Sequence, residues 1–293
     1  MNIKKLGAID IGSNGVRLLI ANVLEESGKA PQFTKASLVR VPIRLGADVF
    51  LSGAISEENT ERLSDAMQAF RLLMKISEVE KYRACATSAM REAKNGDEVA
   101  KSVLKSSGVQ IDIIDGAEEA RIIASTDISA VIKSDRNYLY IDVGGGSTEF
   151  TVFSGGKIEA SRSFPIGTVR MLDGKVTPEV WDEVKHWIKA HTKPYKTIEA
   201  IGSGGNINKI YKNAGVKEGE PLTYDYLRDY LTYLEGFTYE ERISLLGFNP
   251  DRADVVIYAL TVFINAMKWS GAKVVNVPRI GLADGIIRTI YNQ

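Results

Sequence analysis

One turn sequence occurs twice in this chain, with an acid, a glycine and a serine in the same order. Asp10-Ile-Gly-Ser13 follows one predicted strand, and Asp142-Val-Gly-Gly-Gly-Ser147 follows another strand 132 positions later. Each turn leads into a returning strand, so two antiparallel meanders are expected, the second with a tight turn at Gly155-Gly156. The repeat predicts a duplicated α/β protein whose two domains each present an acidic glycine turn to a shared cleft. Two unrelated hairpins are the alternative, because Asp-x-Gly is a common turn sequence.

The second turn has three consecutive glycines and therefore no Cβ atom at its centre. Gly144, Gly145 and Gly146 allow backbone N–H groups to approach an anion closely. Asp142 precedes these glycines and Glu149 follows them. Amides bind phosphate oxygens and carboxylates bind divalent cations, so the pattern favours a site for a phosphate chain that carries Mg²⁺. An ordinary glycine-rich hairpin with exposed acids is the simpler alternative.

The rest of the chain alternates strands with helices, which favours partly parallel sheets. In the first half, helices are expected at 56–76, 96–105 and 115–132, and strands at 82–86 and 109–114. In the second half, helices are expected at 168–172, 178–191, 206–214, 223–234, 239–245 and from 249 onward, with strands at 197–201 and 274–277. A terminal helix begins after Gly281. We predict one domain of residues 1–126 with 282–293, whose C-terminal helix returns to it, and a second domain of residues 127–281.

The composition is that of an ordinary globular protein. Of 293 residues, 44% are hydrophobic and 25% charged, and 37 acids balance 37 bases, so no net charge attracts nucleic acid or an anionic membrane. Cys85 has no partner for a disulfide, which suits a reducing compartment. The N-terminus lacks a secretory apolar segment, and the longest apolar stretch, 255–267, is too short for a membrane span. A cytoplasmic protein is expected, with neither nucleic acid nor membrane as partner.

Two further segments offer charged groups for phosphate chemistry. Glu118 and Glu119 fall in the first turn of a predicted helix, where either acid compensates the helix dipole or orients a water. Nothing in the local sequence separates those two roles. Arg91 follows a strand, where it suits a bidentate phosphate contact or simply a solvated surface position.

A third glycine turn, Gly202-Ser-Gly-Gly205, joins a strand to a helix and forms another possible anion site. None of the three turns has the Walker A spacing or the Gly-x-Gly-x-x-Gly spacing, which disfavours P-loop and dinucleotide sites.

Seven segments together resemble the exopolyphosphatase/guanosine pentaphosphate phosphatase (Ppx/GppA) family in its short, two-domain form. They run in family order over nearly the whole chain: 8–14, 86–96, 116–121, 141–149, 202–205, 251–254 and 281–285. The family is similar in fold to sugar kinases, actin and the heat-shock ATPases. The resemblance therefore implies two ribonuclease-H-like domains with a cleft between them.

The resemblance also implies roles for individual residues. Glu119 would be the catalytic base. Asp142 and Glu149 would bind Mg²⁺ or another divalent cation, with Asp10 nearby. The terminal phosphoryl group would be held by residues of the turns: Ser13, Asn14, Arg91, Gly144, Gly145, Gly146, Ser147, Gly204 and Gly205.

Three positions depart from the family pattern, and they concern binding of the substrate more than the chemical step. Gly15 stands where the family usually has Ser, Ala47 where an acid is usual, and Ala283 where an Arg is expected. The sequence thus predicts a phosphoanhydride hydrolase that releases orthophosphate from the end of inorganic polyphosphate. Guanosine pentaphosphate is the alternative substrate. There are two further alternatives: a sugar-kinase-like phosphotransferase, and a non-catalytic sensor of guanosine tetra- or pentaphosphate. A homodimer is expected, since it would suit an enzyme that binds a long chain.

Overall fold

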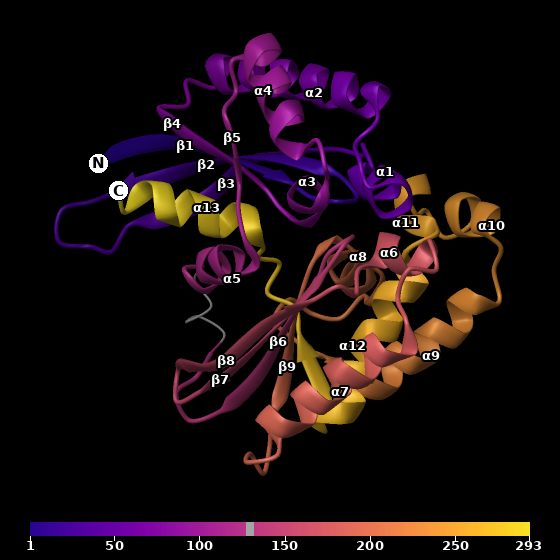
Figure 1. Cartoon of the computed structure of the whole chain (residues 1–293). Coiled ribbons are helices and arrows are strands. Elements are labelled where there is room, and N and C mark those ends of the chain that lie inside the picture. Colours follow the sequence, from indigo (N-terminus) through magenta and orange to yellow (C-terminus); the bar gives the residue numbers. More distant parts are fainter. Residues whose placement is uncertain (127–131) are drawn as a thin grey trace. The chain divides into compact units, whose positions relative to one another are not determined.

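Two mixed β-sheets, one in each of two units, carry the helices of this chain in the computed structural model (Figure 1). The structure describes residues 1–126 and 132–293. Unit 1 comprises Met1–Thr126 and Leu282–Gln293, and unit 2 comprises Asp127–Gly281. The predicted α/β class is confirmed.

The sheet of unit 1 has the strand order β3-β2-β1-β4-β5. Its antiparallel meander is formed by β1 (Asn2–Ile11), β2 (Val16–Glu25) and β3 (Gln32–Val41), and β4 (Lys81–Ala86) and β5 (Ile111–Ile113) extend it in parallel. The helices are α1 (Leu45–Ser52), α2 (Glu57–Ile76), α3 (Ser88–Glu92), α4 (Gly96–Ser107), α5 (Gly116–Ala124) and the terminal α13 (Leu282–Tyr291). In Figure 1, α2 and α4 lie over one face of this sheet and α13 over the other.

The terminal helix packs closely on unit 1 because one of its residues has no side chain. Helix α13 contacts β1 and α5. A Cβ atom at Gly285 would lie 2.1 Å from the carbonyl oxygen of Ile122, so only glycine permits this approach of α13 to α5.

The sheet of unit 2 has the order β10-β11-β9-β6-β7-β8. Its meander is β6 (Asn137–Val143), β7 (Thr148–Ser154) and β8 (Lys157–Phe164), followed by β9 (Glu199–Ser203), β10 (Leu222–Thr223) and β11 (Val274–Asn276). The helices are α6 (Thr168–Leu172), α7 (Pro178–Thr192), α8 (Gly205–Ala214), α9 (Tyr224–Glu235), α10 (Tyr239–Ser244), α11 (Pro250–Ala253) and α12 (Val256–Ser270).

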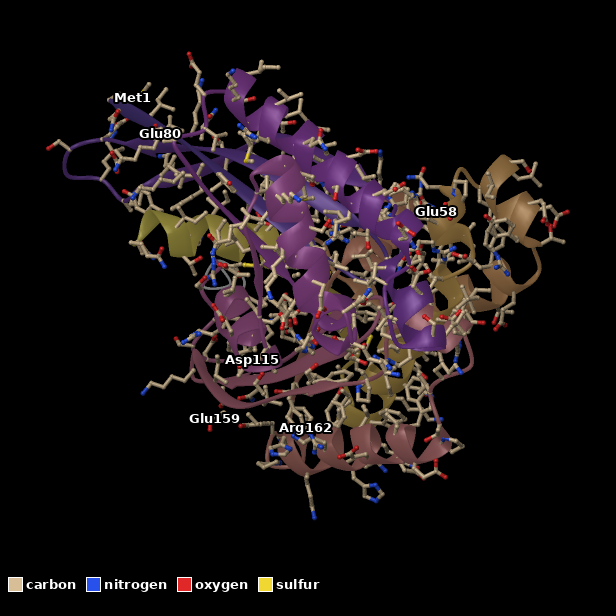
Figure 2. The ribbon with its side chains drawn as sticks, turned by 45° about the horizontal axis from the view of Figure 1, so that its top comes forward. Met1, Glu58, Glu80, Asp115, Glu159 and Arg162 are labelled. Atoms are coloured by element: carbon tan, nitrogen blue, oxygen red, sulfur yellow. The ribbon has the colours of Figure 1, made fainter. Side chains whose placement is uncertain are left out.

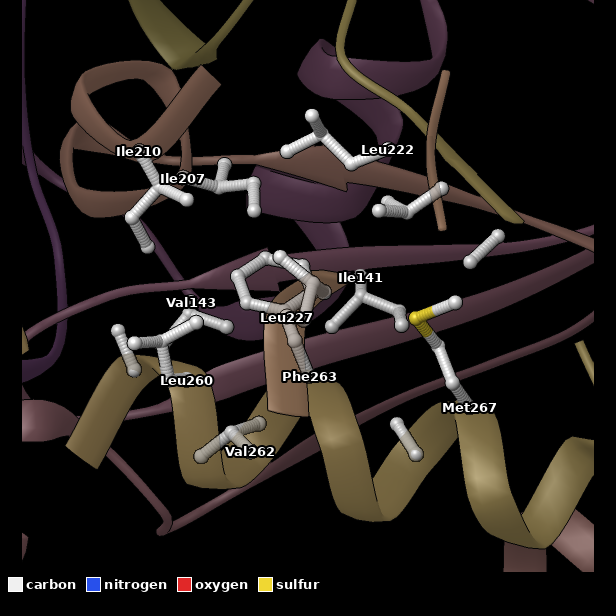
Figure 3. Close-up of a cluster of buried hydrophobic side chains, with 14 of the residues drawn as sticks. Ile141, Val143, Ile207, Ile210, Leu222, Leu227, Leu260, Val262, Phe263 and Met267 are labelled. Carbon is white, nitrogen blue, oxygen red and sulfur yellow. The ribbon is translucent and has the colours of Figure 1, made fainter. Parts of the chain in front are cut away.

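One face of the second sheet forms a large apolar core with α12 (Figure 3). Ile141 and Val143 of β6 alternate toward this core, where they meet Leu260, Phe263 and Met267. Strand alternation places Asp142 on the opposite face. The core therefore fixes the strand that carries the second glycine turn.

Most predicted elements are present, and the differences have local causes. The helix expected at 115–132 ends at Ala124, where Ser125 closes it through a hydroxyl bond to Ile122 O; residues 127–131 of that prediction lie outside the described residues. The helix expected from Asn249 is split into α11 and α12, and the Asn249 side chain makes no cap hydrogen bond. Helices α1 and α3 and strand β10 were not expected. Among the described residues, no helix has the length and apolarity needed to cross a membrane.

Candidate active site

The first acidic turn joins β1 to β2 and is closed by its own backbone. Gly12 N donates to Gly15 O over 3.2 Å. Asp10, only 5% exposed, faces Arg17 on the neighbouring strand, and Arg17 NH1 lies 2.9 Å from Asp10 Oδ2. The predicted metal ligand of unit 1 is thus a buried carboxylate that already has a cationic partner.

The two polar residues of this turn are held by elements that come later in the chain. The hydroxyl of Ser13, itself buried, forms a 2.8 Å hydrogen bond with that of Ser88 at the start of α3. Asn14 Oδ1 accepts from Arg44 Nε over 3.3 Å. Arg44 caps α1 in the left-handed region, at φ 63°, a conformation that costs a non-glycine residue energy.

Gly15, the first departure from the family pattern, has little room for a side chain. An added Cβ would lie 3.0 Å from the Arg40 guanidinium and 3.1 Å from Val41 O. The cross-strand partners Arg17 and Arg40 therefore lie beside the turn without an intervening side chain at Gly15.

The adjacent acids of α5 occupy different environments, a distinction that local sequence left open. Asp115, labelled in Figure 2, caps the helix by accepting from Glu118 N over 2.7 Å. Glu118 accepts from Arg83 NH2 over 2.8 Å, at the sheet. Glu119 is only 7% exposed, and its Oε2 lies 3.6 Å from Arg91 NH1.

Arg91 is fixed by the backbone of unit 1. Its NH1 donates to Ile114 O over 2.8 Å at the end of the β5 segment, while it also faces Glu119. The structure thus brings the predicted base and the predicted phosphate-binding arginine together. Glu118 pairs with Arg83 instead, which favours a structural role for that acid.

The second glycine turn joins β6 to β7 and repeats the construction of the first. Gly144 N donates to Ser147 O over 3.0 Å. Arg170 of α6 donates from Nε to Gly146 O over 2.8 Å. The loop is therefore held both internally and from α6.

Two carboxylates flank this turn on the same face of the sheet. Asp142 and Glu149 are cross-strand partners, so their side chains point to the same side. Glu149 is 4% exposed, and its Oε1 accepts from the hydroxyls of Ser147, over 2.7 Å, and Ser163, over 2.6 Å.

The residues of this pair fit a hard divalent cation. All donors are oxygens, and two adjacent like charges, one of them buried, are stabilised by a counter-charge. Within 1–126 and 132–293, no group of three or more His, Cys, Asp or Glu side chains is placed to hold a metal ion. Two carboxylates are sufficient for Mg²⁺, which commonly binds one or two acids together with substrate phosphates and water. The role of Asp10, in unit 1, stays a prediction.

The third glycine turn lies beside the second because β9 pairs with β6. Ser203 is the register partner of Asp142. Gly204 has φ 109°, and a Cβ there would lie 2.8 Å from Val143 O and 3.5 Å from Asp142 Oδ1. Gly205 opens α8. Unit 2 therefore brings Asp142, Glu149 and both of its glycine turns together, while the shared cleft expected from the duplication stays a prediction.

Four contacts of the site were not predicted from the sequence. Ser88 bonds to Ser13 and Ser163 to Glu149, while Arg44 binds Asn14 and Arg170 binds Gly146 O. Ser88 carries a weak signal, since it stands two residues after the end of a predicted strand. Ser163 carries none, because its position opposite Glu149 depends on a shift in strand register between Val152 and Phe153.

The duplicated meanders, the helix that returns to unit 1 and the glycine turns define a two-unit α/β protein of the actin-like fold. The sequence profile of the Ppx/GppA phosphatase family matches residues 27–292. The chain belongs to this family, which confirms the resemblance found in the sequence and the predicted class of enzyme, a hydrolase.

Curated relatives carry several names. A bifunctional 3-dehydroquinate synthase/phosphatase of Fusobacterium nucleatum is 30% identical over 288 residues, which cover 90% of this chain and 43% of that protein. Exopolyphosphatase 1 of Mycobacterium tuberculosis is 25% identical, with 97% of this chain and 87% of the relative covered. A guanosine-5'-triphosphate,3'-diphosphate pyrophosphatase of Photobacterium profundum is 28% identical, with 96% and 57% covered.

Solved structures share the fold. The Aquifex aeolicus member of the Ppx/GppA family superposes with a TM-score of 0.76 at 25% identity, over 99% of this chain and 98% of that one. A crystal structure described as an exopolyphosphatase from Cytophaga hutchinsonii gives a TM-score of 0.84 at 23% identity, with the same coverage. The predicted actin-like fold is thereby confirmed.

Proposed function

We propose that this protein hydrolyses phosphoanhydride bonds and releases orthophosphate from the end of inorganic polyphosphate. The observation that carries the proposal is the environment of Glu119, a buried carboxylate beside Arg91 in the first turn of α5. A protein that only binds phosphate has little need of such an acid. The names of the mycobacterial relatives support the choice of substrate.

Glu119 would serve as the general base. It would accept one proton of a water while the water oxygen attacks the terminal phosphorus in line with the leaving oxygen. The bond from phosphorus to that oxygen breaks, and the shortened chain leaves with the electron pair. Arg91, held by Ile114 O, would bind the phosphoryl oxygens with its remaining N–H groups.

The turns would hold the phosphoryl group and position it. Peptide N–H groups of Gly145, Gly146 and Ser147 are suited to the oxygens that gain negative charge in the transition state. Ser13, Asn14, Gly204 and Gly205 are assigned to the same binding task. Asp142 and Glu149 would hold Mg²⁺, which when bound neutralises phosphate charge.

Substrate assays test the proposal directly. Orthophosphate release should be measured with polyphosphate, guanosine pentaphosphate and ATP in the presence of Mg²⁺, with ATP and a sugar as a further arm. Fastest turnover of polyphosphate is expected. Binding of these compounds without phosphate release would overturn the hydrolase and favour a sensor, whereas transfer to the sugar without release would favour a kinase.

The adjacent acids provide a matched pair of variants. Glu119→Gln should lower kcat by about 10²- to 10⁴-fold, the usual contribution of a general base, while binding is largely kept. Glu118→Gln, at a residue that binds Arg83, should retain most of the activity. An active Glu119→Gln variant would exclude Glu119 as the base.

Guanosine pentaphosphate is the second candidate substrate, favoured by the name of the Photobacterium relative. The ratio of kcat/KM for the two substrates decides between them. A homodimer and a cytoplasmic location stay predictions, to be tested by analytical ultracentrifugation and by cell fractionation.

A further inference from the structure

The two acidic turns share more than their sequence, because the same backbone bond closes each of them. Gly12 N donates to Gly15 O over 3.2 Å in unit 1, and Gly144 N donates to Ser147 O over 3.0 Å in unit 2. In each unit, the helix that follows the third strand of the meander also contacts the turn.

In unit 2, that helix binds three successive carbonyl groups of the loop. Thr168 N donates to Gly144 O over 3.0 Å, and Val169 N to Gly145 O over 2.8 Å. The side chain of Arg170 completes the series, since its Nε donates to Gly146 O over 2.8 Å. The carbonyl oxygens of Gly144, Gly145 and Gly146 therefore point toward the start of α6.

The direction of these carbonyls determines the direction of the amides. In a trans peptide, the C=O of one residue and the N–H of the next point in opposite directions. The N–H groups of Gly145, Gly146 and Ser147 consequently point away from α6. If a peptide group of this loop were reversed, its carbonyl oxygen would point toward the anion. A carbonyl oxygen and an anion have no favourable interaction.

Gly167 makes this close approach possible. A Cβ atom at Gly167 would lie 2.3 Å from Gly145 O and 2.4 Å from Gly145 C, far inside any van der Waals contact. The neighbouring atoms are backbone and cannot rotate away. Gly167 is N-cap of α6 at φ −127°, an ordinary conformation, so contact with the loop and not backbone strain requires glycine here.

Unit 1 repeats this arrangement at the start of α1. Gly46 N donates to Ser13 O over 2.8 Å. A Cβ at Gly46 would lie 2.9 Å from Ser13 Cβ and 3.1 Å from Ser13 O. Ser13 and Gly145 are both the third residue after the acid of their turn, so each turn is supported at the same place by a glycine.

We propose that Gly167 and Arg170 are positioning residues, which hold the loop at Gly144–Ser147 with its N–H groups directed at the phosphoryl group of the substrate. Gly46 has the corresponding task at Ser13. The identity of the ligand rests on the function proposed above. The anchoring of the loop by α6 does not rest on that function, and it can be measured without any substrate.

Hydrogen exchange tests the loop itself. In Arg170→Ala, the amides of Gly144, Thr168 and Val169, followed by NMR without ligand, should exchange about tenfold faster because local opening becomes easier. Amides of the β6–β9 ladder should be unchanged. Arg162→Ala is the matched control, since this exposed arginine binds Glu183 and lies on β8. Unchanged exchange in Arg170→Ala would overturn the proposal.

Kinetics separate positioning from a general loss of stability. At an unchanged melting temperature, Arg170→Ala should lower kcat/KM by about a hundredfold, the effect expected of a small misplacement of reacting groups. The pH profile should be unchanged, because Arg170 does not exchange protons with the substrate. Faster loop exchange with wild-type kcat/KM would show that the loop does not bind the phosphoryl group.

Gly167→Ala provides a second test at the same contact. It should raise exchange at Gly144 and lower kcat/KM, whereas Gly236→Ala, at the end of α9, should leave both unchanged. If Gly167→Ala does not fold, Arg170→Ala decides. If the wild-type protein hydrolyses no substrate, the proposed function fails, while the exchange experiment still confirms or overturns the anchoring of the loop by α6.

Discussion

Ser163 lies opposite Glu149 on neighbouring strands, and its hydroxyl donates to Glu149 Oε1 over 2.6 Å. A second hydroxyl, from Ser147, donates to the same oxygen over 2.7 Å. A carboxylate held in this way has a fixed orientation, which is the usual requirement for a metal ligand.

Replacing Ser163 should therefore weaken binding of a divalent cation without removing a ligand. Ser163→Ala is expected to lower affinity for Mg²⁺ by about 10- to 100-fold, the usual effect of losing a group that orients a metal ligand. Titration calorimetry with Mn²⁺, or the Mg²⁺ dependence of activity, measures this change. Ser161→Ala is the control, because Ser161 is on the same strand and bonds to Thr151. Equal affinities in the two variants would contradict a metal-binding role for Glu149.

Gly204 should not tolerate a side chain, for two separate reasons. Its φ of 109° is nearly restricted to glycine, and an added Cβ would lie 2.8 Å from Val143 O. We expect Gly204→Ala to lower the free energy of unfolding by about 1–3 kcal/mol and to lower activity, since the Cβ is also directed at Asp142. Urea denaturation and phosphate release provide the two measurements.

The matched control for Gly204 is the other end of the same helix. Gly215 also has a positive φ, of 64°, but an added Cβ there meets no atom within 4 Å among the described residues. Gly215→Ala should cost about 1–2 kcal/mol from backbone strain and leave activity unchanged. Loss of activity in both variants would show that reduced stability, and not the site, is responsible.

Asp48 of α1 should stabilise the start of α2 in a pH-dependent manner. Its carboxylate accepts from Ser56 N over 2.9 Å, from Ser56 Oγ over 2.6 Å and from Asn59 Nδ2 over 2.8 Å. Burial raises the pKa of Asp48. The hydrogen bonds from Ser56 and Asn59 lower it by a larger amount, so the pKa lies below its ordinary value of 3.8. Asp48→Asn is expected to cost about 0.5–1.5 kcal/mol at neutral pH, the usual net contribution of an intramolecular hydrogen bond.

The sign of the pH dependence follows from the lowered pKa. Stability from the Asp48 carboxylate is complete above its ordinary value of 3.8 and is lost as the pH falls through the lower pKa of the folded state. Urea unfolding of the wild type and of Asp48→Asn should be measured between neutral and acidic pH. The difference between their free energies of unfolding should disappear at the acidic end. Asp65→Asn, at an exposed position of α2, is the control. If the difference in free energy of unfolding between wild type and Asp48→Asn did not change with pH, the ionised Asp48 carboxylate would not be the source of the stability.

Cys85 should be inert in the folded protein. Burial raises the pKa of its thiol to about 12 from an ordinary value of 9.0, and the residue is fully covered. Because only the thiolate reacts, its fraction at pH 8 is lower by about a thousandfold than for an ordinary thiol. Ellman's reagent should modify Cys85 only in denaturant. Rapid modification of the native protein would show that β4 opens.

Strong local signals made much of the fold predictable. Helix α6 has the predicted bounds, Thr168–Leu172, and Ser56 caps α2 by accepting from Asn59 N over 3.2 Å. Helix α1 was not predicted because its N-cap, Arg44, has a left-handed conformation that no residue type in the sequence signals. Helix α5 was predicted too long because its end depends on Ser125 and on packing against Gly285.

The turns of the candidate site were readable because glycines and acids at short spacing determine local backbone and charge. The sequence by itself therefore determined the duplicated turns, the pair Asp142 and Glu149 and the two candidate bases Glu118 and Glu119. Only the tertiary structure separated the bases, because Arg83 and Arg91 come from distant segments.

The register of the second meander was likewise decided only by the folded chain. Counting outward from the Gly155-Gly156 turn, where Ser154 pairs with Lys157, would place Arg162 opposite Glu149. The irregularity between Val152 and Phe153 shifts the pairing by one residue, so Ser163 occupies that position. A one-residue shift moves every side chain of a strand to the other face. Sequence thus determined which residues form the turns, and long-range pairing decided which side chains hold their acids in place.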